Sequence, residues 1–336
     1  MSNESVPREI QNPKSKIQNP LRILVMGAGS IGSSVGGFMA KTGHTVTVVG
    51  HEAHMEAIRK NGLRISGIWG DHLVTSLRAQ TDLSGLRRGD FDLIYVSVKS
   101  YDSAVAGAAI APLVDDRTLV CAYQNGLGNA EAIAEAVGWE HVIGASVIYG
   151  AWLPEPGHVD VTVIAHPTTL GMYVASPSAE HVRAIVAAMN EAGLPALYSD
   201  EIATVLWAKI AYNSALNPLS ALLDVPYGVL AETDYAVETM REVVGELYAV
   251  ADAMHVRMNP ATAPEYMDLL IAKLIPPTAA HYASMREDFR QHRRTEIDAL
   301  NGAICRFGKQ HGVPCPSNTV LTRLVHAREY ALGVRY

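Results

Sequence analysis

Apolar residues follow two different patterns along the chain, and the change between them falls near residue 200. Before that point, short and nearly continuous apolar runs alternate with polar turns, which predicts a buried parallel sheet. The strands are expected at residues 21–26, 46–49, 91–98, 118–122, 142–147 and 196–198. Helical periodicity predicts helices at residues 31–42 and 178–192.

Shorter paired segments in the same half predict two antiparallel hairpins. The hairpins are expected between residues 63–65 and 72–77, and between residues 158–164 and 168–174. The second pair is joined through Pro167 and is expected at the rim of the sheet.

From Ser199 onward the strand pattern disappears, and the rest of the chain predicts helices. They are expected at residues 200–216, 219–223, 236–254, 263–273, 284–291, 295–311 and 318–332, with Pro218 interrupting the first two. This switch predicts an α/β domain over residues 21–199 followed by an all-α domain over residues 200–336. The cleft between two such domains is the default ligand site.

Composition narrows the class of protein. The chain has 336 residues, of which 49% are hydrophobic and 18% charged, enough for two globular domains. No apolar run reaches the roughly 18 residues of a membrane span. The formal net charge of -7 argues against nucleic acid as the main partner. Residues 1–20 are polar and lack the apolar core of a secretory signal, so we expect a disordered leader.

The chain has three cysteines, which are Cys121, Cys305 and Cys315. They form no C-x-x-C motif, and none is paired with a histidine at the spacing of a metal site. We therefore expect reduced thiols in a cytoplasmic protein, with no disulfide and no bound metal.

The first predicted strand ends in a glycine-rich turn that opens the first predicted helix. Its residues are Gly27, Ala28, Gly29, Ser30, Ile31 and Gly32. In such a turn the first glycine permits the tight bend, the second lets the backbone approach a pyrophosphate, and the third allows close packing of the helix. The pattern predicts a Rossmann-type dinucleotide-binding domain, and the alternative is a glycine-rich turn in another α/β domain.

The residues after the second predicted strand bear on the choice of cofactor. An NAD-binding domain usually has an acidic residue at the end of this strand for the ribose 2'-hydroxyl. This chain has Gly50 and His51 there, and Glu52 comes two residues late. His51, with Arg59 or Lys60, could instead meet the 2'-phosphate of NADP, which we prefer; the alternative is that these are solvated surface charges.

Polar residues follow two more of the predicted strands. Lys99 follows the strand at residues 91–98, and Asn125 follows the strand at residues 118–122. Ligands of open α/β sheets bind beyond the carboxyl ends of the strands, so both side chains are candidates for the site. The alternatives are an ordinary surface lysine and an Asn-Gly turn.

Lys209, Asn213 and Asn217 are spaced four apart and share one face of a predicted helix. An unpaired buried polar group costs about 1–3 kcal/mol, so this stripe is a poor core face. It is either a solvated face or the edge of a site. Further on, Ser284 and Glu296 stand at predicted helix starts, where a capping role is the alternative to a functional one.

Six ordered motifs carry a resemblance to a known family. They are GAGSIG at residues 27–32, VKSYD at 98–102, QNGLGN at 124–129, EPG at 155–157, WAKIAYNSALNPLSALL at 207–223 and SMREDFRQHRRTEIDALNG at 284–302. With them the chain resembles the ketopantoate reductases, also called 2-dehydropantoate 2-reductases, from about Leu21 to Glu329.

The resemblance implies NADPH-dependent reduction of a 2-keto acid. It implies that Lys209 is the general acid, and that Glu296 is its partner and a cofactor contact. It also places Asn213, Asn217 and Ser284 against the substrate, and Lys99 and Asn125 near nicotinamide and substrate. An ammonium group suits this chemistry, because hydride addition builds negative charge on the ketone oxygen.

Two positions depart from the family pattern. His51 stands where an arginine is common, which bears on the preference for NADP. Tyr227 stands where relatives often carry a substrate-binding asparagine, and a tyrosine adds bulk and removes an amide. A branched or aromatic 2-keto acid other than ketopantoate would suit this change.

The leading hypothesis is therefore a ketopantoate reductase that makes pantoate for coenzyme A synthesis. Its alternatives are a reductase of another branched or aromatic 2-keto acid, and a non-catalytic NADP-binding redox sensor. The pairing of Lys209 with Glu296 argues against the sensor, which needs no proton donor. Methionines of the helical half could form a homodimer face or simply core.

Overall fold

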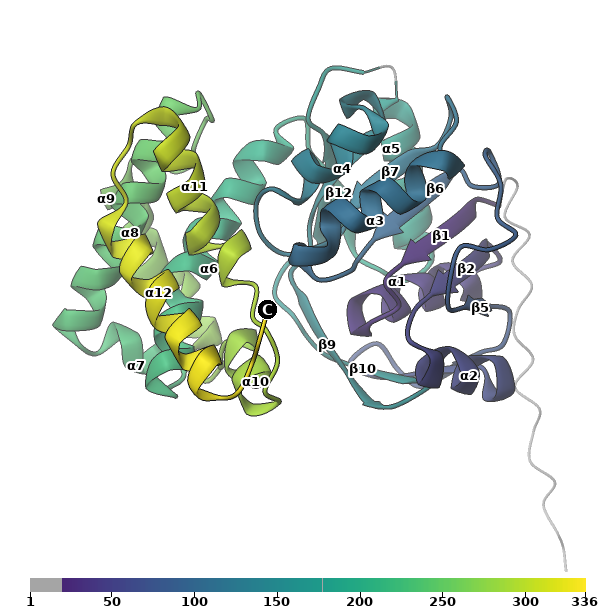
Figure 1. The fold of residues 1–336 in the computed structure, drawn as a ribbon, viewed down its shortest axis with the longest axis horizontal. Helices are drawn as coiled ribbons and strands as arrows, with labels where there is room; N and C mark the ends of the chain where they lie inside the picture. Colours follow the sequence, from purple (N-terminus) through teal and green to yellow (C-terminus); the bar gives the residue numbers. More distant parts are fainter. Residues whose placement is uncertain (1–19, 177) are drawn as a thin grey trace, which may run out of the picture.

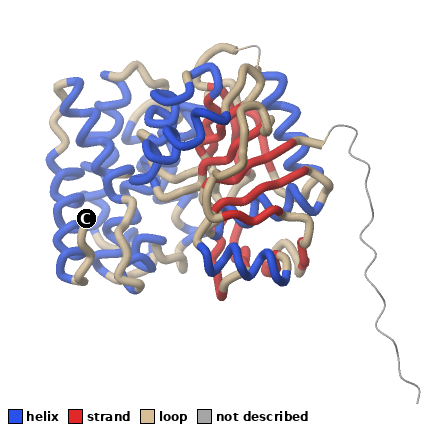
Figure 2. Tube along the Cα trace, turned by 45° about the vertical axis from the view of Figure 1, so that its right-hand side comes forward, coloured by secondary structure: helices blue, strands red, loops and turns tan. Residues whose placement is uncertain are grey.

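The structure is a computed structural model that describes residues 20–176 and 178–336. The leader predicted at residues 1–20 lies outside the described residues except for Pro20. Figure 1 shows an α/β part beside a helical part, and Figure 2 shows the strands gathered in one of them. The predicted order, a dinucleotide-binding α/β domain followed by a helical domain, is confirmed. The boundary between residues 199 and 200 stays a prediction.

The larger sheet has the order β12-β11-β8-β7-β6-β1-β2-β5. Its strands are β1 (Arg22–Met26), β2 (Thr45–Val49), β5 (Arg78–Gln80), β6 (Leu93–Val96), β7 (Leu119–Ala122), β8 (Val142–Ser146), β11 (Thr168–Met172) and β12 (Ala196–Tyr198). The pairing of β11 with β8 is antiparallel, and the other neighbours are parallel. All six strands expected from apolar runs are present.

Helices cover both faces of this sheet, which explains why its strands are almost wholly apolar. The helices of the α/β part are α1 (Ser30–Lys41), α2 (Glu52–Asn61), α3 (Ser103–Ile110), α4 (Asn129–Val137) and α5 (Ala179–Glu191). In β1, Ile23 and Val25 join the core that includes α1, whereas Leu24 joins the core under α3 and α4. Each of these three side chains has no exposed surface.

A second sheet has the order β4-β3-β10-β9. Its strands are β3 (Leu63–Gly67), β4 (His72–Val74), β9 (Tyr149–Glu155) and β10 (His158–Ile164). The hairpin expected between residues 63–65 and 72–77 is confirmed as the antiparallel pair β3 and β4.

The hairpin expected between residues 158–164 and 168–174 is wrong. β10 pairs with β9 and β3, whereas β11 pairs with β8 and β12 in the other sheet. Every residue of β11 is buried, which requires a place inside a sheet covered on both faces. In β10, buried Val159 and Val161 alternate with more exposed residues, as expected for a sheet with one solvent-exposed face.

The helical part contains seven α-helices among the described residues. They are α6 (Ile202–Leu223), α7 (Tyr227–Ala231), α8 (Asp234–Ala253), α9 (Ala263–Leu269), α10 (Ser284–Arg290), α11 (Asn301–His311) and α12 (Pro316–Ala331). α6 contacts α8, α10 and α12 of the helical part and β8 and β11 of the larger sheet, so it joins the two parts. Met240 and Met267 are buried in the core of this part, and Met254 and Met258 are partly buried and pack against it.

The predicted break at Pro218 is wrong, because α6 runs through it from Ile202 to Leu223. A proline inside a helix leaves the carbonyl four residues earlier without its N–H donor. Here the carbonyl of Ser214 accepts a hydrogen bond from Nδ2 of Asn301, at 3.1 Å. This side chain from α11 replaces the missing donor and allows the helix to continue.

The single helix expected at residues 295–311 is also wrong. A short 3-10 turn (Ile297–Ala299) comes first, and α11 begins only at Asn301. Groups from other elements form hydrogen bonds with the backbone of this segment. The N–H of Thr295 donates to the side chain of Glu329 at 2.6 Å, and the carbonyl of Ala299 accepts from the N–H of Leu127 at 2.8 Å. The helix expected at residues 263–273 is α9 followed by a π-helical turn (Leu270–Leu274).

Candidate active site

The glycine turn lies between β1 and α1, and each glycine meets a different environment. Gly27 has a φ of +103°, and a Cβ there would lie 2.6 Å from the backbone nitrogen of Val98. A Cβ at Gly32 would overlap the carbonyl oxygen of Gly27. Gly29, the N-cap of α1, has nothing within 4 Å of its Cβ position. The turn therefore leaves open space beside a helix N-terminus, which fits a pyrophosphate.

The end of β2 carries the other predicted cofactor contact. His51 is the exposed N-cap of α2, and its side chain makes no cap hydrogen bond. Glu52 forms an ion pair with Arg59 at 2.5 Å, and both side chains are largely exposed. An acidic and a basic group thus meet at the edge where a cofactor ribose would lie.

Lys209 reaches from α6 to the sheet. Its Nζ donates hydrogen bonds to Oδ1 of Asn125, at 2.8 Å, and to the carbonyl of Val147, at 2.5 Å. Burial lowers the pKa of Lys209 to about 8, and the negative charge of Glu296 opposes that shift. An amine with this pKa is protonated at neutral pH and can give its proton up readily.

A polar cavity lies where the two parts meet, with about 290 Å³ of space that is partly open to solvent. Five predicted site residues line it: Asn125, Asn213, Asn217, Ser284 and Glu296. Three further residues complete the lining: Met285, Asp288 and Leu300. Ser284 is the first residue of α10, whose N-cap is Ala283, and the cap makes no side-chain hydrogen bond. The capping alternative for Ser284 is therefore not supported.

Two carboxylates in this cavity belong to an ion-pair network. Nζ of Lys99 lies 3.5 Å from both Asp288 and Glu296, and the N–H of Ser100 donates to Oε1 of Glu296 at 3.0 Å. Arg293 also pairs with Asp288, at 2.9 Å. Burial lowers the pKa of Lys99, but Glu296 and Asp288 outweigh it, so the net shift is upward. Burial raises the pKa of Asp288 against the pull of its cations.

Glu296 contacts Lys99 directly rather than Lys209. Between the described side chains of Lys209 and Glu296 there is no hydrogen bond or ion pair within 4 Å, and Glu296 acts on Lys209 through its charge. Asp288 was not predicted. It lies four residues after Ser284 and so shares its helix face, which is the signal that could have found it.

Tyr227 does not line the cavity directly. It is 3% exposed, and its hydroxyl donates to Oδ1 of Asn217 at 2.6 Å. The bulk that the sequence predicted at this position therefore lies behind an amide of the site.

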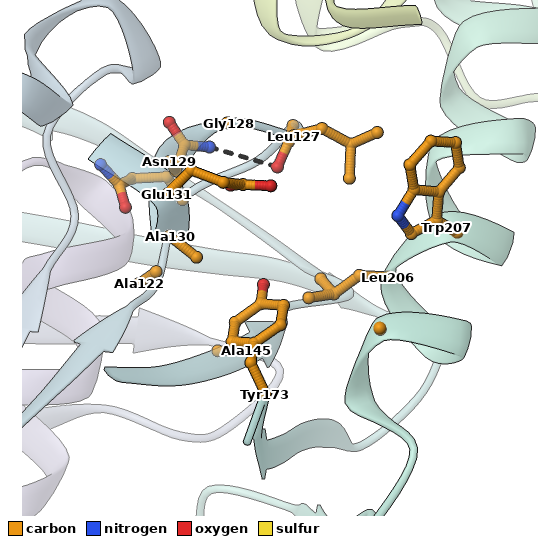
Figure 3. Close-up of a pocket in the computed structure, with 13 residues that line it drawn as sticks. Ala122, Leu127, Gly128, Asn129, Ala130, Glu131, Ala145, Tyr173, Leu206 and Trp207 are labelled. Carbon is orange, nitrogen blue, oxygen red and sulfur yellow. Dashed lines mark hydrogen bonds between the residues drawn. The ribbon is translucent and has the colours of Figure 1, made fainter. Parts of the chain in front are cut away.

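A second cavity lies on the other side of the segment that carries Asn125. Figure 3 shows Leu127, Tyr173, Leu206 and Trp207 around it. No predicted site residue lines this cavity. Among the described residues there is no group of three or more potential metal ligands. No described helix has the length and hydropathy to cross a membrane.

A glycine turn at the edge of a mostly parallel sheet, beside a helical domain whose lysine reaches the residues after two of the strands, defines a two-domain dinucleotide-binding oxidoreductase. Residues 23–174 match the family described as Ketopantoate reductase PanE/ApbA, and residues 201–329 match its C-terminal domain. The chain belongs to the ketopantoate reductase family. It is a 2-dehydropantoate 2-reductase-like oxidoreductase, and the family binds a nicotinamide cofactor.

Individual relatives agree with this assignment. The 2-dehydropantoate 2-reductase of Aquifex aeolicus is 36% identical over 92% of this chain and 97% of its own. A ketopantoate reductase structure from Ralstonia eutropha has a TM-score of 0.82 at 32% identity, covering 94% of this chain and 100% of that one. D-mandelate dehydrogenase with NADH and anilino(oxo)acetate has a TM-score of 0.83 at 28% identity, with the same coverage.

Proposed function

We propose that this protein reduces ketopantoate to pantoate with NADPH, in the pathway to pantothenate and coenzyme A. The observation that carries the proposal is the position of Lys209. Its Nζ lies 2.8 Å from Oδ1 of Asn125, which lines the cavity together with the amides of Asn213 and Asn217. The Aquifex aeolicus relative, 36% identical, supports the choice of ketopantoate.

In this proposal the nicotinamide supplies a hydride to the carbonyl carbon of the keto acid. Lys209 stabilises the negative charge that develops on the ketone oxygen and donates its proton there. Asn125 and the carbonyl of Val147 hold Nζ in place. Asn213, Asn217 and Ser284 bind the rest of the substrate. The charge of Glu296 opposes the lowering of the Lys209 pKa by burial and so helps to keep the lysine protonated.

The proposed cofactor site runs along the carboxyl edge of the sheet. The turn from Gly27 to Gly32, with Ala28, Ser30 and Ile31, would hold the pyrophosphate. His51 would lie near the 2'-phosphate, and Lys99, Asn125 and Glu296 near the nicotinamide end. The proposal of NADPH rests on the basic groups near the end of β2, and NADH is the rival because Glu52 is there too.

A second candidate function is the reduction of another branched or aromatic 2-keto acid. It is favoured by the 28% identity to D-mandelate dehydrogenase, whose structure was determined with NADH and anilino(oxo)acetate. The redox-sensor alternative remains the weakest, because it gives no role to Lys209. A cytoplasmic location is supported by the three cysteines, which form no disulfide among the described residues.

Steady-state kinetics test the proposal. The assay would compare ketopantoate, 3-methyl-2-oxobutanoate and phenylglyoxylate, each with NADPH and with NADH. The proposal expects the highest kcat/KM for ketopantoate with NADPH. Lys209→Ala should lower kcat by about 10²–10⁴-fold with unchanged NADPH affinity. The control is Lys309→Ala, an exposed lysine of α11. Unchanged activity in Lys209→Ala would refute the proposed role.

A further inference from the structure

Tyr227 is held firmly at the start of α7. Its N–H donates to the carbonyl of His281 at 3.0 Å. Its ring packs edge-to-face against the rings of Tyr212 and His281, at centroid distances of 5.9 and 5.3 Å. The hydroxyl therefore has little freedom to move, and it points at the side chain of Asn217.

The hydrogen bond between these residues has a preferred direction. Burial raises the pKa of Tyr227, so the hydroxyl keeps its proton. Its partner among the described residues is Oδ1 of Asn217, at 2.6 Å. If the amide were turned over, the hydroxyl would accept from NH2 and its own proton would be left unsatisfied, at a cost of about 1–3 kcal/mol.

Asn217 is therefore left with its NH2 group for the cavity. The NH2 group of Asn125 is likewise left for the cavity, because its Oδ1 accepts a hydrogen bond from the ammonium group of Lys209, which can only donate. Two amides that line the cavity thus present donors to a ligand. Asn217 lies eight residues after Lys209 on α6, about 12 Å along the helix axis. Of the three polar residues of this stripe, Asn217 is the farthest along α6 from Lys209, the proposed proton donor.

We propose that Tyr227 is a positioning residue that holds Asn217 as a hydrogen-bond donor to an oxygen on the side chain of the keto acid. The inference rests on the proposed function. In ketopantoate that oxygen is the 4-hydroxyl. The compound 3,3-dimethyl-2-oxobutanoate lacks this hydroxyl and is otherwise identical, so the two keto acids form a matched pair.

The test is Tyr227→Phe, which keeps the ring and removes the hydroxyl. We expect KM for ketopantoate to rise about fivefold, the effect of one hydrogen bond, with kcat nearly unchanged. KM for 3,3-dimethyl-2-oxobutanoate should change by less than about twofold. The control is Tyr212→Phe. Tyr212 belongs to the same aromatic cluster, but its hydroxyl bonds to Thr278, which does not line the cavity. Equal effects on the two keto acids, or none, would overturn the inference.

A second measurement does not depend on turnover. The NH2 signal of Asn217 in the ¹⁵N side-chain spectrum is assigned by its loss in Asn217→Asp. In wild type, this NH2 group should give one sharp pair of proton signals. Tyr227→Phe should broaden or shift it, and Tyr212→Phe should not. An unchanged signal in Tyr227→Phe contradicts the positioning role. If neither keto acid is reduced, the proposed function fails, and this spectrum still decides the role of Tyr227.

Discussion

Nζ of Lys99 lies 3.5 Å from the carboxylate of Glu296, although 197 positions of sequence separate them. The pair joins the end of β6 to the segment before α11, and therefore joins the two parts of the molecule beside the cavity. Glu296 is thus fixed by the α/β part, while its charge still opposes the lowering of the Lys209 pKa by burial.

This arrangement predicts a pH dependence of ketone reduction. The reaction needs protonated Lys209, whose pKa is about 8, so kcat/KM should fall about tenfold per pH unit above that value. Glu296→Gln removes the charge that raises this pKa, and the falling limb should move to lower pH. A pH profile of kcat/KM that extends about two units to either side of this pKa measures both effects. If the falling limb of the Glu296→Gln profile lies at the same pH as in wild type, the charge of Glu296 does not affect the pKa of Lys209.

The glycine turn predicts opposite outcomes for two substitutions. Gly29→Ala adds a Cβ in open space, so the melting temperature should stay unchanged while the Kd for NADPH rises about tenfold, or about 1.4 kcal/mol. Gly32→Ala puts a Cβ against the Gly27 carbonyl and should lower stability by about 1–3 kcal/mol. Thermal unfolding and fluorescence titration distinguish them. Normal cofactor affinity in Gly29→Ala would place the pyrophosphate elsewhere.

Glu52 predicts a change in cofactor preference. Glu52→Gln removes the ion pair with Arg59 and a charge that would repel a 2'-phosphate. The ratio of kcat/KM for NADPH to that for NADH should rise about two- to fivefold, the scale of an exposed ion pair. Glu56→Gln, an exposed change on the same helix, is the control. A ratio that falls would contradict a 2'-phosphate near Arg59.

Glu329 predicts a link between the last helix and the site. Its side chain is fully buried and accepts from the N–H of Thr295, the residue before Glu296, at 2.6 Å. Glu329→Gln should lower the free energy of unfolding by about 1–3 kcal/mol and lower kcat as well. Urea unfolding and steady-state kinetics measure the two effects. Glu180→Gln, an exposed change, is the control, and a normal kcat in a destabilised Glu329→Gln would show that the link is structural only.

Local patterns allowed much of the fold and part of the cavity to be predicted. The glycine turn and the stripe of Lys209, Asn213 and Asn217 are each contained in a few turns of backbone, so spacing alone identifies them. The strands of the larger sheet are apolar because helices cover both faces, and this also shows in sequence.

Long-range contacts account for what the sequence could not predict. The continuation of α6 through Pro218 depends on a donor from Asn301, and the break before α11 depends on acceptors and donors from other elements. The pairing of Glu296 with Lys99 needs the two parts to be placed together. The contact of Tyr227 with Asn217 likewise arises only in three dimensions.

Trp207 gives this molecule a built-in optical probe. Its indole is 5% exposed and forms a wall of the second cavity, which also includes Gly126 and Leu127, directly after Asn125 (Figure 3). A keto acid that binds to Asn125 and displaces it would change the surroundings of this indole. The part of the emission that comes from Trp207, one of four tryptophans in the chain, should then change on binding in rapid-mixing experiments, with no dye attached.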